Sequence, residues 1–237
     1  MNMPMRATPI HTRIAYTLLA ALACLPVAIW WMSVQHPMAY LRMTGLPPGQ
    51  ALFVLAKLAG LLAVVALWMQ AMLALAGRVP LLRVLPASTL RQHQWLGAVT
   101  ALLVLAHVVL FIVATTLRKQ AFAIDLLWPN LDHGYYFFNV GLGAFAFWLL
   151  VLTVFAGWRT ARGDRRWRVV HLLWPVLIGL VFFHALAIGS ESRFGAMRGV
   201  MIVLAITVGL AGVARMLMTL RSRFVAVPKG LESKTVR

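Results

Sequence analysis

The 237-residue sequence has little cysteine and few acidic residues. Its one cysteine, Cys24, excludes an intrachain disulfide, an iron–sulfur cluster and a cysteine-based zinc site, because each of these needs several thiolates. Asp and Glu together number 5 against 22 Lys and Arg, so the formal net charge is +17. Charged residues make up only 11% of the chain. That is too little charge for the wetted surface of a soluble domain.

Apolar residues are abundant. They form 62% of the sequence, and the mean hydropathy is +0.86. A helix of roughly 20 apolar residues crosses a ~30 Å hydrocarbon core. We therefore predict an all-α polytopic membrane protein, a bundle of six transmembrane helices. The predicted spans are residues 14–34, 51–76, 94–117, 136–158, 169–188 and 199–220.

These spans form one predicted domain, residues 14–220, between an N-terminal segment, 1–13, and a tail, 221–237. The first span also has features of a signal peptide, because basic residues precede it and residues 21–24 faintly resemble a lipoprotein cleavage site. Its apolar stretch is longer than a simple signal core, which favours a membrane span.

Positive charges predict the orientation of the spans. With the N-terminus in the cytoplasm, the cytoplasmic connections hold sixteen of the 22 Lys and Arg residues, and the outer connections hold five. Lys and Arg accumulate on the cytoplasmic side of membrane proteins, so both termini should be cytoplasmic. We expect the bacterial inner membrane as the location. The same bias explains the basic charge without nucleic-acid binding.

Four histidines lie in or at the edge of the third and fifth spans. His93 and His107 are fourteen residues apart, and His171 and His184 are thirteen apart. An imidazole in a hydrocarbon-facing helix is costly unless its ring nitrogens are satisfied. Four of them at nearly repeated spacing therefore require a common explanation.

The two pairs are matched in depth. Both spans run outward, and each has an arginine just before its first histidine: Arg91 before His93, and Arg168 before His171. At ~1.5 Å per residue, the second histidine of each span lies about 20 Å further out, still within the membrane. Each depth therefore holds two imidazoles, one from each span, as the axial ligands of a low-spin haem iron would be.

Helical phase supports one pair better than the other. At ~100° per residue, fourteen residues bring His107 to within about 40° of His93, whereas thirteen leave His184 roughly 140° from His171. Pro175 cannot donate to the carbonyl of His171, so we expect a kink or local rewinding there. The alternative is that such histidines are hydrogen-bonding residues in helix packing, with His93 as an interfacial cap.

The sequence around the histidines resembles the ferric reductase-like transmembrane domain of ferric reductases and NADPH oxidases. Residues 90–97 with 105–107 are similar to its third helix, and residues 165–171 with 182–184 to its fifth. The unequal spacing of the histidines is itself a feature of that family. The resemblance covers about residues 14–220. It implies two b-type haems between the third and fifth helices, with His93 and His171 on the inner haem and His107 and His184 on the outer one.

The family implies that electrons pass from a cytoplasmic reduced flavin or nicotinamide, through the inner and outer haems, to ferric iron or a similar oxidant outside. The chain would be an oxidoreductase or an electron-transfer subunit of one. Arg91, Arg166 and Arg168 lie at the expected height of the inner haem propionates and could pair with them, or they only set topology. Lys57 and Arg193 are weaker candidates for the outer propionates.

Two features differ from typical members of this family. Those proteins continue into a flavin and nicotinamide domain, whereas only residues 221–237 follow the last span here, and no dinucleotide-binding glycine pattern occurs. We therefore expect a separate cytoplasmic flavoprotein or loosely bound FAD or FMN as donor, docking at residues 159–168. Phe111 occupies the position of an oxygen-holding histidine in the oxidases, which disfavours superoxide production.

Two other functions stay open. The chain also resembles the stand-alone haem-binding membrane subunit of periplasmic methionine sulfoxide reductase systems, which passes electrons to a periplasmic acceptor protein. That relative has a basic residue at the position of His93, so two haems fit it less well. A haem-free membrane scaffold or transporter would use the 9 Trp and 12 Met as lipid-facing and packing surface.

Overall fold

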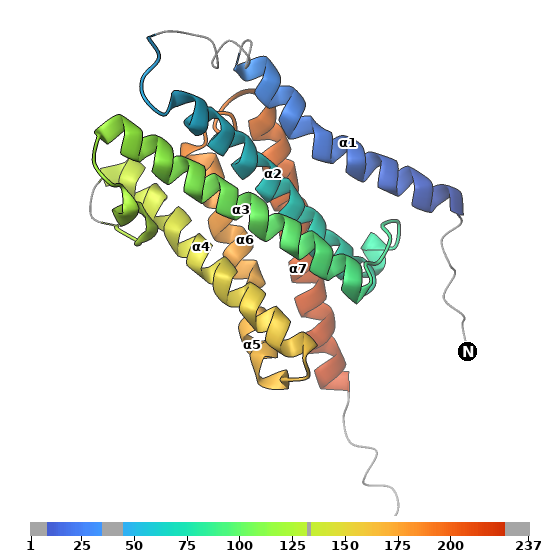
Figure 1. Ribbon diagram of the computed structural model, residues 1–237. Coiled ribbons are helices and arrows are strands. Elements are labelled where there is room, and N and C mark those ends of the chain that lie inside the picture. Colours follow the sequence, from blue (N-terminus) through green and yellow to red (C-terminus); the bar gives the residue numbers. More distant parts are fainter. Residues whose placement is uncertain (1–8, 35–44, 132–133, 226–237) are drawn as a thin grey trace, which may run out of the picture.

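A computed structural model describes residues 9–34, 45–131 and 134–225, which fold into helices joined by loops and short turns (Figure 1). Within these residues, six helical segments are long and apolar enough to cross a membrane, and each coincides with a predicted span. The all-α, six-span prediction is confirmed. The long helices are α1 (Pro9–Ser33), α2 (Gln50–Ala76), α3 (Leu90–Lys119), α4 (Gly134–Ala161), α6 (Trp174–Ile188) and α7 (Gly195–Val225). The short ones are η2 (Pro80–Leu82), η3 (Ile124–Leu127), η4 (Arg165–Trp167) and α5 (Arg168–His171).

Helix α3 begins with a capping box, which places His93 inside the helix. The hydroxyl of Thr89 accepts from the N–H of Gln92 at 3.2 Å, and the side chain of Gln92 accepts from the N–H of Thr89 at 2.9 Å. These two bonds satisfy N–H groups that the start of a helix leaves without partners. Thr89, and not His93, is therefore the cap, so the interpretation of His93 as a cap residue is wrong.

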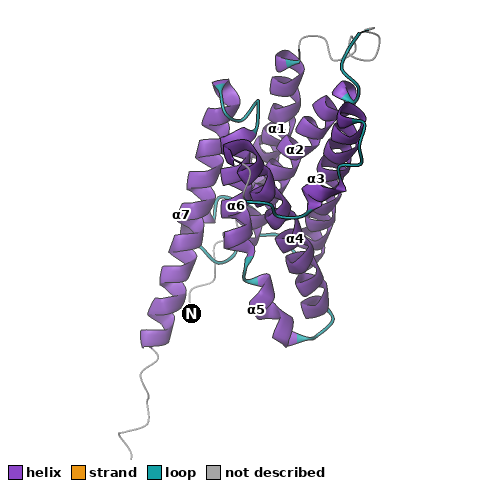
Figure 2. Cartoon of the chain, turned by 90° about the vertical axis from the view of Figure 1, so that its left-hand side faces the viewer, coloured by secondary structure: helices purple, strands orange, loops and turns teal. Residues whose placement is uncertain are grey.

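The fifth span differs from the continuous helix predicted over 169–188. Helix α5 ends at His171, and α6 begins at Trp174 with Pro175 in its first turn. Between them, the N–H of Leu173 donates to the carbonyl of Val170 at 3.0 Å, a bond of the tighter three-residue type. Proline lacks the N–H that would continue the α-helical ladder from His171. The expected kink is thus a break between two helices, and Figure 2 shows α5 offset from α6 at the end of the bundle.

Two helix pairs enclose the middle of the bundle. Helix α3 packs along α2, with which it lies side by side in Figure 1, and α6 packs along α4. Contacts between the two pairs, α3 with α4 and α2 with α6, are sparse. Helices α1 and α7 cover the other side of α2 and α6, where the largest buried apolar cluster forms around Met197 and Met201.

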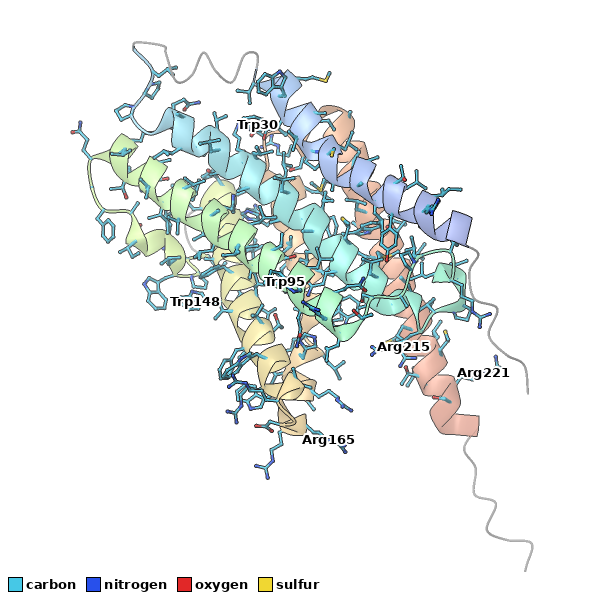
Figure 3. All side chains as sticks on the ribbon, turned by 45° about the vertical axis from the view of Figure 1, so that its right-hand side comes forward. Trp30, Trp95, Trp148, Arg165, Arg215 and Arg221 are labelled. Carbon is cyan, nitrogen blue, oxygen red and sulfur yellow. The ribbon has the colours of Figure 1, made fainter. Side chains whose placement is uncertain are left out.

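The outer surface of the bundle is apolar. Helix α3 buries little of its length, and its exposed side chains include Trp95 and Leu102, at 66% and 65% exposure. An apolar surface of this extent is stable against lipid and not against water. Arg165, Arg215 and Arg221 lie toward one end of the bundle (Figure 3). The architecture is therefore that of an integral membrane protein, whose predicted terminal segments fall mostly outside the described residues.

Candidate functional site

His93 of α3 and His171 of α5 lie close together toward the arginine-rich end of the bundle. Their ring centroids are 6.2 Å apart, and their planes are nearly perpendicular, at 86°. A bond from a metal to an imidazole nitrogen is about 2 Å long, and the ring centre lies about 1 Å behind that nitrogen, so two imidazoles on one metal have centroids about 6 Å apart. The observed separation fits one iron between the two rings.

His107 of α3 and His184 of α6 line a single cavity further along the bundle. The cavity lies between the two helix pairs, α2 with α3 and α4 with α6, and it extends from Thr100 in the middle of the bundle to Glu191 beyond the end of α6. Most of its lining is aliphatic or aromatic. An apolar space with an imidazole on each side has the chemistry that a haem requires.

Three of the four imidazoles are held by the same kind of hydrogen bond, from ring Nδ1 to a backbone carbonyl of a neighbouring helix. With Nδ1 donating, the other nitrogen, Nε2, carries the lone pair that a metal binds. Helices α2 and α4 thus orient the rings carried by α3, α5 and α6. The Nδ1–O distances are 2.7 Å for His107 with Ala56, 3.0 Å for His171 with Thr153 and 2.8 Å for His184 with Asn139.

His93 differs from the other three histidines. Its Nδ1 is buried and has no hydrogen-bond partner within the described part of the chain. Leaving a buried donor or acceptor without a partner costs about 1–3 kcal/mol. The four positions are therefore alike in residue type but not in the support that the fold gives them.

The predicted inner propionate partners lie on the surface at the same end as His93 and His171. Arg91 precedes His93 by two residues, Arg166 belongs to η4, and Arg168 begins α5. All three side chains are exposed. They are free to reach a haem edge or to remain in the interfacial region, so their role as propionate partners stays a prediction.

The weaker outer candidates, Lys57 and Arg193, have partners of their own. The ammonium group of Lys57 lies 3.0 Å from a carboxylate oxygen of Glu191, and both residues line the outer end of the cavity. Lys57 also lies 5.3 Å from the ring centre of Phe53. The guanidinium of Arg193 lies 4.8 Å above the ring of Phe194. Sequence reasoning missed Glu191, because residues far apart along the chain meet only in the fold.

Helices α2 and α4 are the part of the site that sequence reasoning missed. Neither helix carries a histidine that contacts the cavity, yet their carbonyls hold three imidazoles. A signal was present in the sequence, because Gly143 and Gly157 of α4 are fourteen residues apart, nearly the interval between His171 and His184. On α4 this interval returns to the same helix face, within about 40°.

The fold and these contacts define a class: polytopic membrane proteins with two pairs of histidines at two depths of a helical bundle. Residues 59–183 match the family model described as the ferric reductase like transmembrane component. The match spans more than half of the chain and includes His93, His107 and His171, while His184 follows it directly. The chain therefore belongs to the ferric reductase-like transmembrane family. Neither a curated protein nor a solved structure matches it.

Proposed function

We propose that this protein carries electrons across the membrane through two b-type haems, with His93 and His171 binding the inner haem and His107 and His184 the outer one. Membership of the ferric reductase-like family suggests transmembrane electron transfer. The observation that carries the proposal is the 6.2 Å separation of the His93 and His171 rings. Haem iron supplies the redox chemistry, and the protein supplies ligands, spacing and an apolar surrounding.

An apolar layer lies between the two depths. Leu150 of α4 is seven residues from both Gly143 and Gly157, which contact His184 and His171 respectively. It belongs to a buried cluster with Leu177, against which Leu67 and Val104 pack. In the proposed function this layer excludes water between the two sites. It also holds the helix pairs at the separation that the ligands need.

The electron donor is proposed to dock at the arginine-rich end, and the positive charges there support a cytoplasmic location for it. Between the last turn of α4 and the connection after it, Arg159 pairs with Asp164 at 2.8 Å, and the guanidinium of Arg162 lies 3.9 Å above the ring of Trp158. Arg165 follows directly and is exposed. A positive surface of this kind suits an acidic partner, here a separate flavoprotein that carries FAD or FMN.

The acceptor is proposed to receive electrons at the outer end, either as ferric iron or a similar oxidant or as a periplasmic oxidoreductase. The second possibility corresponds to the haem-binding subunit of methionine sulfoxide reductase systems. The closeness of His93 to His171 favours the two-haem form, because that subunit has a basic residue where His93 stands. Orientation with both termini in the cytoplasm, in a bacterial inner membrane, completes the proposal.

Absorption spectroscopy tests the proposal. Purified protein reduced with dithionite should show b-type bands, and the pyridine haemochrome assay should give two haems per chain. His107→Ala should remove the outer haem and leave one, whereas Thr100→Val, which changes another residue of the cavity lining, should leave two. Absence of b-type bands would contradict the proposal and leave the haem-free scaffold or transporter. One haem in the parent protein would favour the methionine sulfoxide reductase type of subunit.

A further inference from the structure

Each imidazole whose Nδ1 is hydrogen-bonded lies against a glycine of the neighbouring helix. In every case the glycine follows the accepting carbonyl by four residues. The pairs of accepting residue and glycine are Ala56 with Gly60, Asn139 with Gly143 and Thr153 with Gly157. In an α-helix the N–H of residue i+4 bonds to the carbonyl of residue i, so a side chain at i+4 stands beside that carbonyl.

A methyl group at Gly60 or Gly143 would collide with the imidazole, and one at Gly157 would crowd it. A Cβ at Gly60 would lie 2.9 Å from Nδ1 of His107, and one at Gly143 would lie 2.5 Å from Cε1 of His184. At Gly157 the nearest ring atoms of His171 would be 3.2 Å away. The absence of a side chain therefore gives each ring access to its carbonyl.

The register of α2 against α3 locates the corresponding residues at His93. The two helices are antiparallel, and His107 lies at Ala56 and Gly60. Fourteen residues back along α3 and fourteen forward along α2 bring His93 to Gln70 and Ala74. The same register places the side chain of Gln70 against Gly97, as the structure has it.

By this register Ala74 corresponds to the glycine of the other three positions, and a Cβ there would fill the space through which the imidazole reaches a carbonyl, here that of Gln70. This correspondence accounts for the buried Nδ1 of His93, which has no partner among the described residues. A hydrogen bond from Nδ1 of a ligand histidine raises the basicity of the nitrogen that binds the metal, and so stabilises the more highly charged metal.

We infer that Gly60, Gly143 and Gly157 are positioning residues that admit three haem-ligand imidazoles to helix carbonyls, and that Ala74 withholds this bond from His93. The inference rests on the two-haem function proposed above. Among the four proposed ligands, His93 is then the one whose metal-binding nitrogen is not made more basic by a hydrogen bond from Nδ1. The inner haem then has one supported ligand, and the outer haem has two.

Gly143→Ala tests the supported positions. The added methyl group displaces His184 from its carbonyl, so the haem content should fall from two per chain to one. Gly179→Ala is the matched control, because Gly179 also lies within a transmembrane helix and an added Cβ there meets no atom within 4 Å. The control should retain two haems with unchanged reduced spectra and midpoint potentials.

Ala74→Gly tests the unsupported position with a readout that folding alone does not move. The variant should keep two haems and shift the midpoint potential of one of them downward in a redox titration, because His93 gains a carbonyl acceptor. Ala71→Gly is the control for glycine in the same helix, since Ala71 packs against the cluster on the α1 and α7 side. It should leave both midpoint potentials where they are in the parent.

The outcomes separate this inference from the proposed function. A parent protein without haem contradicts the proposed function and the inference together. A two-haem parent whose content and potentials survive Gly143→Ala unchanged overturns the inference alone. If Gly143→Ala does not fold, Ala74→Gly decides, and potentials equal to those of the parent and of Ala71→Gly overturn the inference.

Discussion

Several polar side chains inside the apolar bundle have partners, although Nδ1 of His93 has none among the described residues. Ring nitrogens of His107, His171 and His184 reach backbone carbonyls, and Lys57 reaches Glu191. Inside a membrane the cost of a charge without a partner is high, so such groups pair or face a cavity. The Lys57–Glu191 pair does both, and it should contribute to the stability of the outer end.

Glu191→Gln should clearly lower the thermal unfolding midpoint, because it leaves the charge of Lys57 without its counterion. The side chain of Lys57 is 24% exposed and that of Glu191 is 9% exposed, so the pair is largely buried. Breaking a buried pair costs about 3–5 kcal/mol, and the partial exposure of Lys57 brings our expectation to about 1–3 kcal/mol. Asp164→Asn, which breaks the more exposed pair with Arg159, should cost less than about 1 kcal/mol. Thermal unfolding of both variants is measured by tryptophan fluorescence in the same detergent. Equal losses of stability in the two variants would contradict this ranking.

Helices are the elements that the sequence predicts best, because a run of twenty apolar residues has few other stable arrangements in a bilayer. Their ends extend beyond the predicted bounds at capped or charged turns, as at Thr89, which polarity alone does not locate. Pro175 indicated an irregularity, but the size of the break between α5 and α6 follows from packing against α4. Residue type does not identify the carbonyls that accept from the imidazoles, since every residue has one; the interval between Gly143 and Gly157 was the signal that pointed to two of them.

The break between α5 and α6 allows His171 and His184, which are thirteen residues apart, to face the same neighbouring helix at two depths. On a continuous helix His171 and His184 would point about 140° apart, yet in the structure both contact α4, at Thr153 and Asn139. Leu172 and Leu173 depart from regular α-helical geometry, with ψ of −4° and −1°, and we expect this departure to turn His171 back toward that helix. The interruption is therefore part of the site, and removing its cause should disturb one pair of histidines and not the other.

Pro175→Ala should favour a continuous helix, because alanine supplies the N–H that can bond to the carbonyl of His171. His171 would then turn away from Thr153, and the inner haem should be lost while the outer one remains, giving one haem per chain. Pro26→Ala in α1 is the control, because Pro26 also lies inside a helix, and α1 packs mainly against α2 and α7, which carry none of the four histidines. Two haems in Pro175→Ala would show that the break does not set the phase.

The whole molecule has an apolar surface and a strong difference in charge between its ends. The exposed apolar side chains of α1 and α3 suit lipid. Arginines gather at one end of the bundle, in the connections at residues 77–89 and 162–167 and at the end of α7. Retention of Lys and Arg on the cytoplasmic side predicts that this end faces the cytoplasm. In the proposed function, orientation decides which pair of histidines is near the donor and therefore where electrons enter.

Labelling of single cysteines tests this orientation in the full-length chain. Cys24 is exposed on α1, so Cys24→Ser is introduced first as the unlabelled background. In that background, Ala121→Cys should react with a membrane-impermeant maleimide in cells whose outer membrane has been permeabilised, because Ala121 follows the outer end of α3. Arg165→Cys should react only after the inner membrane is opened.

Ala121 and Arg165 are both exposed, at opposite ends of the bundle, so a difference in labelling does not arise from burial of one position within the protein. The reverse pattern would place the arginine-rich end outside, and electrons would then enter at His107 and His184.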